Sequence, residues 1–337
     1  MEAISGAHSH GTLASASTAS TWRRVIIPNY NGGDLLRRCL EALNRERDQL
    51  HEIVVVDDAS TDDSVALALR MNARVIRREK NGGPAAARNQ GALDSTGEII
   101  WFLDSDTEIR PGATHVLMNH FVANPTLAAV IGSYDDTPSA PAAASQFKNL
   151  FHHYVHQQGP DVVSSFWSGC GAMRRDAFDA VGGFDAEYWR EPMIEDIHLG
   201  YELGKRGLQI HILKSLQVTH HKAWTIKSLV KTDIFHRAVP WTALLLRSNK
   251  YRNRELNLGN HARNSVICVY LAIVCCLAAI WHWWFLIGTA ALLAAVIPLN
   301  WGLLSFFRRK RGSVFWLKCV ALLWLYYWYC GVGLMLP

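Results

Sequence analysis

Two carboxylates one residue apart, Asp104 and Asp106, directly follow an apolar run from Ile99 to Leu103. An apolar run of this length, bounded by turn residues, predicts a buried strand of a parallel sheet. Ligands of open α/β sheets bind at the carboxyl ends of the strands. Two carboxylates at that point suit a divalent cation that holds a diphosphate. A helix N-cap or a surface turn explains the same pattern, so the rest of the chain has to decide between these interpretations.

Three more clusters of polar side chains could act together with this pair. Asp57 and Asp58 end a second apolar run, Glu195 and Asp196 open a predicted helix, and His220 and His221 follow a predicted strand. Adjacent residues of a strand point to opposite faces, so we expect only one of the two histidines to face the acids. The structural alternative for the acid pairs is a favourable charge at a helix N-terminus.

Strands and helices alternate along the first hundred residues. Apolar runs predict strands at residues 25–28, 53–56, 74–77 and 99–103, and the segments between them predict helices at 34–46, from 61 onward and at 84–93. Such alternation predicts an α/β fold with a mostly parallel sheet, right-handed crossovers and flanking helices. Its first half would bind a nucleotide, and the acid pairs would meet at one edge of the sheet.

The net charge of +5 is unevenly distributed. Residues 222–337 carry 14 Lys and Arg against 2 acidic residues, whereas residues 1–221 carry 20 against 27. Because the basic part also contains the longest apolar segments, we expect attraction to anionic lipid headgroups and not to nucleic acid. The seven Cys show neither disulfide nor zinc spacing, and the five in the C-terminal region are interpreted as small hydrophobic residues.

Composition divides the chain into four parts. Residues 1–22, rich in Ser, Ala and Thr, predict a disordered tail and lack the features of a signal peptide. Residues 23–222 predict the catalytic domain, with a nucleotide-binding half at 23–107 and an acceptor half at 108–222. Residues 223–264 mix basic and apolar side chains, which favours amphipathic helices at a membrane surface. Residues 265–337 predict a membrane-spanning region.

The membrane prediction rests on long uncharged runs. Residues 265–307 contain no Asp, Glu, Lys or Arg over 43 residues, a helical length of about 65 Å and thus two spans of a ~30 Å hydrocarbon core. We predict spans at about 266–282, 284–307 and 314–336. The basic flanks place the catalytic domain on the cytoplasmic side and the C-terminus on the opposite side. A buried helix of a soluble protein is the alternative for each run.

Four motifs in order resemble the family 2 glycosyltransferases over residues 23–245. They are Val25-Ile26-Ile27-Pro28-Asn29-Tyr30-Asn31, Val55-Val56-Asp57-Asp58-Ala59-Ser60-Thr61-Asp62, Ala87-Arg88-Asn89-Gln90-Gly91 and Leu103-Asp104-Ser105-Asp106. The resemblance implies a GT-A fold, a nucleotide-sugar donor and inversion at the anomeric carbon. It also implies donor-site roles: Pro28 and Tyr30 line the base, Asp58 accepts from a base N–H and so favours uracil, Arg88 lies near base and phosphates, and Asp104 holds the ribose.

The second half continues the resemblance. Ser168-Gly169-Cys170-Gly171 and Glu195-Asp196 match the family's glycine-rich turn and acid pair. The resemblance implies that Gly169 lies against the donor sugar, that Asp196 is the general base and that Glu195 bonds donor hydroxyls. In a subset of the family a His at the place of His220 completes the metal site with Asp106. Carboxylate, imidazole and diphosphate together suit Mn²⁺ or Mg²⁺.

One departure from the family concerns processive members, which carry Gln-x-x-Arg-Trp near this point. Here Arg237 and Trp241 are separated and no Gln is correctly placed, which disfavours polymerisation, although Arg237 could still meet the diphosphate. We expect transfer to a lipid or lipid-linked acceptor at the cytoplasmic face of a membrane such as the bacterial inner membrane. The alternatives are a polysaccharide synthase, transfer to a soluble or protein glycan, a nucleotidyltransferase and an inactive membrane scaffold. The oligomeric state is not predicted.

Overall fold

The computed structural model describes residues 23–247 and 259–336, and its first half is a parallel sheet. The strands are β1 (Arg23–Asn29), β2 (Glu52–Asp57), β3 (Arg74–Arg77) and β4 (Ile99–Leu103), in the order β3-β2-β1-β4. The helices between them are α1 (Gly33–Asn44), η1 (Arg47–Gln49), α2 (Ser64–Arg70) and α3 (Gly83–Leu93). All three strand pairings are parallel, as the sequence predicted, so the four C-terminal strand ends share one edge.

The second half extends the same sheet with strands of both directions. Its elements are β5 (Thr107–Ile109), α4 (Ala113–Ala123), β6 (Ala129–Tyr134), α5 (Ala143–Gln158), β7 (Val162–Val163), β8 (Cys170–Arg174), α6 (Arg175–Val181), α7 (Glu195–Lys205) and β9 (Ile210–His220). Beyond β4 the order is β8-β6-β9-β5, with β7 paired to β9. The α/β fold class is confirmed, and β8 introduces antiparallel pairing against both β4 and β6.

Apolar cores on both faces of the sheet hold these strand ends in place. In β1, Ile27 belongs to the core beneath α1, and Ile26 to the core beneath α3 and α7. Burial on both faces explains why β1, β2 and β4 appear in the sequence as continuous apolar runs. The carboxylates that follow β2 and β4 are therefore fixed by strands whose side chains are almost fully buried.

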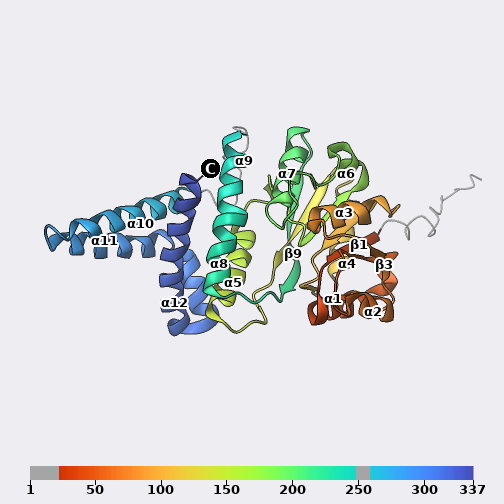
Figure 1. Cartoon of the computed structure of the whole chain (residues 1–337), viewed down its shortest axis with the longest axis horizontal. Helices are drawn as coiled ribbons and strands as arrows, with labels where there is room; N and C mark the ends of the chain where they lie inside the picture. Colours follow the sequence, from red (N-terminus) through yellow and green to blue (C-terminus); the bar gives the residue numbers. More distant parts are fainter. Residues whose placement is uncertain (1–22, 248–258, 337) are drawn as a thin grey trace, which may run out of the picture.

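The C-terminal part is helical. It contains α8 (Ile226–Lys231), the π-helix η2 (Thr232–Ala238), α9 (Val239–Arg247), α10 (Asn260–Ala278), α11 (Trp284–Leu299) and α12 (Trp301–Met335). Figure 1 shows α10 and α11 as a hairpin that points away from the sheet, while α12 crosses its base and runs beside α9. Among the described residues, α10 and α12 are long and apolar enough to cross a membrane, and α11 is shorter.

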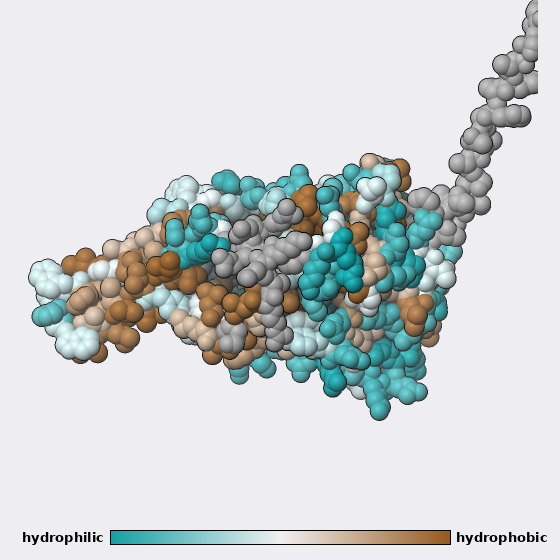
Figure 2. Space-filling model, turned by 90° about the horizontal axis from the view of Figure 1, so that it is seen from above, coloured by the Kyte–Doolittle hydropathy of each residue, from teal (hydrophilic) through white to brown (hydrophobic). Residues whose placement is uncertain are grey.

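The observed helices differ from the predicted spans in their limits. The predicted run 284–307 is divided at Asn300, where α11 ends and α12 begins, and α12 is kinked at Gly312, whose φ is 82°. Figure 2 shows apolar surface gathered on the hairpin and polar surface over the sheet domain. The predicted tail 1–22 and residues 248–258 of the predicted interfacial segment lie outside the described residues.

Candidate active site

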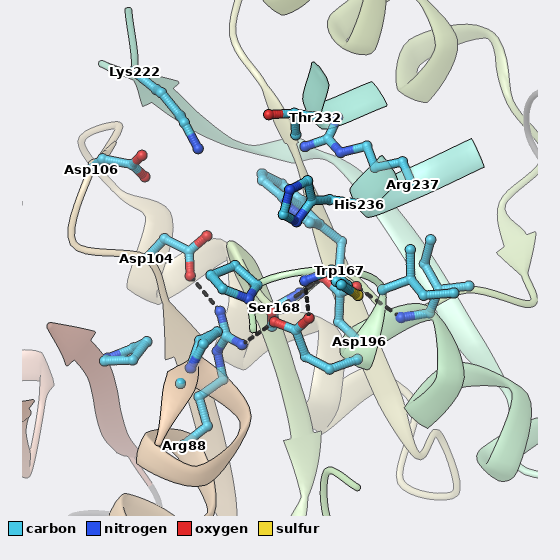
Figure 3. A pocket seen from close by; sticks show the side chains of 18 of the residues that line it. Arg88, Asp104, Asp106, Trp167, Ser168, Asp196, Lys222, Thr232, His236 and Arg237 are labelled. Atoms are coloured by element: carbon cyan, nitrogen blue, oxygen red, sulfur yellow. Dashed lines mark hydrogen bonds and ion pairs between the residues drawn. The ribbon is translucent and has the colours of Figure 1, made fainter. Parts of the chain in front are cut away.

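A cavity of about 590 Å³ opens at the C-terminal edge of the sheet, between the strand ends and the helical segment α8–η2–α9. Nearly all the residues predicted for the site line it: Pro28, Tyr30, Asp58, Arg88, Asp104, Asp106, Glu195, Asp196, His220 and Arg237. Figure 3 shows Asp104, Asp106 and Lys222 on one side of the cavity and His236 and Arg237 on the other, with Asp196 below these two. The topology thus collects residues from seven separate segments into one cavity.

Asp58 is held at the N-terminus of α3. Its buried carboxylate accepts hydrogen bonds from the backbone N–H groups of Gly82 (3.1 Å) and Gly83 (2.8 Å) and an ion pair from Arg78 (2.7 Å). The structural alternative, a charge at a helix N-terminus, is therefore present, although the helix is α3 and not the one that follows Asp58 in sequence. Contact between Asp58 and a base stays a prediction, supported by its place in the cavity wall beside Pro28.

Arg88 lies beneath the cavity and joins the end of β4 to the start of α7. Its guanidinium donates to Asp104 Oδ1 at 2.7 Å and to Glu195 Oε1 at 3.0 Å, and it packs over the Phe184 ring at 5.5 Å. Only 4% of the side chain is exposed. The sequence placed Arg88 near base and phosphates. Its described contacts are instead with protein carboxylates, because a planar guanidinium can meet two acids at once.

The two acids at the start of α7 have different surroundings. Glu195 is buried, with one oxygen on Arg88 and the other accepting from the Met193 backbone N–H at 2.9 Å. Asp196 is partly exposed to the cavity and accepts from the backbone N–H and the hydroxyl of Ser168 at 3.1 and 3.2 Å. Burial, and next the charge of Glu195, raise the pKa of Asp196 to about 6. Asp196 can therefore accept a proton near neutral pH.

Asp106 and His220 come together through the pairing of β5 with β9. Asp106 Oδ2 lies 3.4 Å from His220 Nε2, and Asp106 Oδ1 is buried without a hydrogen-bond partner among the described residues. The other ring nitrogen, His220 Nδ1, donates to Asn149 Oδ1 at 2.8 Å, and the ring stacks on Tyr134 at 4.7 Å. The Asn149 contact leaves the Nε2 lone pair directed to Asp106, an arrangement that metal-ligating histidines commonly share.

The second histidine is turned away from this pair, as expected for adjacent strand residues. His221 Nε2 lies 3.0 Å from Glu108 and its Nδ1 lies 2.8 Å from the Ser139 hydroxyl. Within residues 23–247 and 259–336, no three His, Cys, Asp or Glu side chains are grouped to hold a metal alone. A cation at Asp106 and His220 would thus take further ligands from a bound diphosphate, as oxygen-seeking cations do.

Gly169 does not line the cavity in the way the sequence suggested. A side chain at Gly169 would collide with the Trp167 indole, and the Gly169 carbonyl accepts from the Asp104 backbone N–H at 3.2 Å. The cavity wall is made by its neighbours Trp167 and Ser168. Gly169 therefore has a positioning role: it lets Trp167 lie flat and ties the glycine-rich turn to the end of β4.

Four cavity residues on the C-terminal side were not assigned from the sequence: Lys222, Thr232, His236 and Trp241. Lys222 lies 4.6 Å from the Trp224 ring, and Trp241 Nε1 donates to Tyr201 of α7 at 2.9 Å. Thr232, His236 and Arg237 all belong to η2, and π-helices are frequent at functional sites. A local widening of one helical turn has no sequence signal, which explains why Thr232 and His236 were missed; Lys222 and Trp241 lie outside η2.

Two histidines of α5 form part of the cavity wall. His152 and His156 both line it, and His156 is 7% exposed. Burial lowers the pKa of His152 well below its usual range and that of His156 to about 4. Both rings are therefore neutral at physiological pH and contribute shape and hydrogen bonding, not charge.

Comparison with known proteins relates the first part of the chain to a family. A profile described as "Glycosyl transferase family 2" matches residues 24–182. These residues form a family 2 glycosyltransferase domain. The uncharacterized glycosyltransferase YibD of Escherichia coli is 39% identical over 98 residues, which cover 28% of this chain and 28% of YibD. Glycosyltransferase GlyG of Streptococcus pneumoniae is 36% identical over 115 residues, or 33% of this chain and 38% of GlyG.

The matched stretches therefore span well under half of these two relatives. A longer match is to an N-acetylglucosaminyl-diphospho-decaprenol L-rhamnosyltransferase of Mycobacterium tuberculosis, 25% identical over 59% of this chain and 76% of its own length. Among solved structures, the mannosyltransferase PcManGT from Pyrobaculum calidifontis, in complex with GDP-Man and Mn²⁺, resembles 94% of this chain and 88% of its own with a TM-score of 0.57. At 19% identity this likeness shows a shared fold.

Proposed function

We propose that the family 2 domain transfers a sugar from a nucleotide-sugar donor to an acceptor hydroxyl with inversion at the anomeric carbon. The observation that carries the proposal is the placement of Asp196 and of the Asp106–His220 pair around one cavity at the strand ends. Asp196 is a partly exposed carboxylate that can take a proton. Asp106 and His220 form a carboxylate–imidazole pair suited to a cation and a diphosphate. Inverting transfer needs both functions in one site.

A UDP-sugar is the first candidate donor. Pro28 and Tyr30 would flank the base at the mouth of the cavity, where 54% of Tyr30 is exposed. Asp104 keeps one oxygen beyond its bond to Arg88 and could hold the ribose. Asp58 would select among bases, because a base without a matching N–H leaves a buried acceptor unpaired. The donor GDP-Man of the related PcManGT makes a guanine nucleotide the competitor to test.

The residues around Asp106 fit a divalent cation. The buried, unpartnered Asp106 Oδ1 and the Nε2 lone pair of His220 are the donor types that Mn²⁺ and Mg²⁺ accept. When bound, such a cation would act as a Lewis acid on the leaving diphosphate. Lys222, beside Asp106, and Arg237, across the cavity, would add positive charge near the same leaving group.

The protein's part in the reaction is proton transfer and orientation. Asp196, held by Ser168, accepts the proton of the acceptor hydroxyl while that oxygen bonds to the anomeric carbon. The bond from the anomeric carbon to the diphosphate breaks on the opposite face, and its electron pair leaves with the nucleoside diphosphate. Glu195, fixed by Arg88 and Met193, stays in place beneath the sugar and keeps Asp196 turned toward the cavity.

The proposed acceptor is a lipid or lipid-linked hydroxyl or phosphate at the membrane face. The apolar C-terminal helices and the basic, aromatic segment on the cavity's C-terminal side support it. The relative named for a diphospho-decaprenol acceptor supports the same class. Purified enzyme in nanodiscs, incubated with labelled donor and extracted with organic solvent, should place the label in the organic phase. Label only in the aqueous phase would favour a soluble glycan or protein acceptor.

The donor and metal assignments have a direct test. A panel of nucleotide sugars is screened with Mn²⁺ for hydrolysis and thermal stabilisation, with EDTA and with Asp106→Ala. We expect one nucleotide sugar to be used, and both EDTA and the substitution to abolish its use. Glu108→Ala is the matched control, since Glu108 lies two residues away and contacts His221 and Arg45. Equal donor use with EDTA, or no use of any nucleotide sugar, contradicts the proposal.

A further inference from the structure

The hairpin α10–α11 exposes its apolar side chains along most of its length. Large residues that are between 53% and 62% exposed include Ile267, Val274, Leu277, Leu286 and Ile287. Figure 2 shows this surface as a continuous apolar arm beyond the sheet domain. The 19 residues of α10 and the 16 of α11 give helical lengths of about 28 and 24 Å. These lengths approach the ~30 Å hydrocarbon core of a bilayer.

The tip and the base of the hairpin are both polar or aromatic. Trp281, His282, Trp283 and Trp284 form the tip, and Trp side chains are enriched at membrane–water interfaces. At the base, the buried Asn300 donates to the Ser265 hydroxyl at 2.9 Å and accepts from the Tyr327 hydroxyl at 2.6 Å. Between these two ends the side chains are apolar or small apart from Tyr270, whose hydroxyl donates to the Trp328 carbonyl at 3.0 Å, so the hairpin has the profile of a membrane insertion.

Helix α12 is also apolar enough to span a membrane, but it is more buried against the rest of the protein than α10 is. Of its most apolar 18 residues 44% are buried, against 17% in α10. Near Gly312, Arg311 donates to Gln146 at 2.9 Å and to the Asp136 carbonyl at 3.1 Å. Further along, the Tyr326 ring lies 4.9 Å from Phe151 of α5. Both contacts are with the catalytic domain.

The last turns of α12 reach the cavity wall itself. Tyr329 donates to Asp233 at 2.6 Å, and a side chain at Gly333 would collide with Ala238. Asp233 and Ala238 belong to η2, which also carries Arg237 into the cavity. A span that left the domain would carry its far end about 30 Å away. Residues 313–335 instead contact α5 and η2, and they also contact the hairpin at Tyr270 and Leu293.

We propose that the hairpin α10–α11 is the element that crosses the bilayer, and that residues 313–335 of α12 lie along the membrane surface beside α9. Exposed Arg263 at the hairpin base and Arg308, Arg309 and Lys318 on α12 would meet anionic headgroups at that level. The C-terminus then lies on the same side as the catalytic domain. This replaces the three-span arrangement expected from the sequence, and it holds whatever the donor and acceptor are.

The first experiment places an epitope tag in three full-length chains: before Met1, after His282 and after Pro337. Antibody access is compared in intact and in permeabilised spheroplasts. We expect the tags before Met1 and after Pro337 to behave alike and the tag at the tip to behave oppositely. A tag after Pro337 that is accessible together with the tip overturns the proposal. A tip accessible together with the N-terminus, or a chain released from membranes by alkaline carbonate, overturns it as well.

The second experiment compares equal charges on the two elements. Val274→Arg with Ile287→Arg puts charge on the hairpin, and Val314→Arg with Leu317→Arg puts it on α12, at sites that are 56–60% and 63–71% exposed. Charge in the hydrocarbon core is costly, so the hairpin pair should lower the membrane-inserted fraction at least ~10-fold. The α12 pair should leave it within about twofold, as expected for Arg at the headgroup level. Equal losses from both pairs overturn the proposal.

Discussion

The end of β4 and the start of α7 each carry two acids, and the two places use them in the same way. At β4, Asp104 contacts Arg88 while Asp106 faces His220. At α7, Glu195 contacts Arg88 while Asp196 faces the cavity. One acid of each pair is thus fixed by a shared guanidinium, and its partner is left for ligands. Arg88 thus couples the end of β4 to the start of α7.

The two places differ in how the second acid of each pair, Asp106 or Asp196, is oriented toward the cavity. Ser105 separates the acids at β4, which leave the strand in a turn and are 35% and 21% exposed as side chains. The acids at α7 are adjacent in the first helical turn and differ in direction by about 100°. One is therefore buried against Arg88 and the other turned to the cavity. A turn provides an exposed ligand for a cation, and a helix start provides a partly desolvated base.

The largest expected effect comes from Asp196→Asn. The amide keeps the shape and an oxygen for Ser168 but cannot take a proton, so turnover should fall by ~10²–10⁴-fold, with donor affinity little changed. Single-turnover rates and donor titrations measure the two quantities. Glu195→Gln is the matched control, because its amide oxygen can still accept from Arg88, and its loss should be smaller. A larger loss for Glu195→Gln would exchange the two roles.

The second largest effect is expected from removing the Arg88 guanidinium, which Asp104 and Glu195 share. Arg88→Met leaves Asp104 and Glu195 without their common partner in a buried setting, and breaking such pairs costs about 3–5 kcal/mol of folding stability. Denaturant unfolding of the purified protein measures it. Arg88→Lys keeps the charge but offers one ammonium in place of a fork, so its loss should lie between the wild type and Arg88→Met. An unchanged midpoint for Arg88→Met would mean that the two halves are held together by other contacts.

The first half of this domain could be predicted from the sequence because one signal dominates it. Strands buried on both faces are continuous apolar runs, and the predicted residues 25–28, 53–56 and 99–103 lie within such strands. The predicted strand 74–77 coincides with β3, which is partly exposed. The order of β8, β6, β9 and β5 follows no such rule, since β6 pairs with β9 in parallel while the pairs β4–β8, β8–β6 and β9–β5 are antiparallel. The apolar C-terminal runs indicated helices but not their neighbours, because hydropathy does not record what a helix packs against.

In the candidate site, too, some features could be predicted from the sequence and others could not. Local motifs indicated Asp58, Asp104, Asp106 and Asp196, whose positions follow from a strand or a helix start. Distant partners were not visible: Asn149 on α5 meets His220, and Ser168 meets Asp196, through tertiary packing alone. The protein partners of Arg88, Asp104 and Glu195, were not predicted either, although a buried guanidinium needs fixed opposite charges. The place of Arg88 near base and phosphates stays a prediction.

Substitution of Asn149 tests the proposed cation site at Asp106 and His220 more mildly than removal of either of these residues. Asn149→Leu removes the acceptor that orients His220 while nearly conserving volume. Loss of such supporting partners weakens metal affinity ~10–100-fold. Calorimetry of a nucleoside diphosphate at graded Mn²⁺ concentrations measures it. Asn149→Asp keeps an acceptor and should restore most of the affinity. Equal Mn²⁺ dependence in wild type and Asn149→Leu would show that His220 does not serve as a ligand.

The smallest expected effect is a pH dependence that separates the two working acids. Burial first and then Glu195 raise the pKa of Asp196 to about 6, while Arg88 and the Ser168 N–H act in the opposite direction. The base must be ionised to accept a proton, so kcat should be constant above about pH 7 and fall about tenfold per unit well below pH 6. Asp106, by contrast, has a lowered pKa beside His220 and stays ionised over this range. Donor affinity should therefore hold at pH values where turnover has already dropped. Turnover and affinity falling together would place the titrating group at the donor end of the cavity instead.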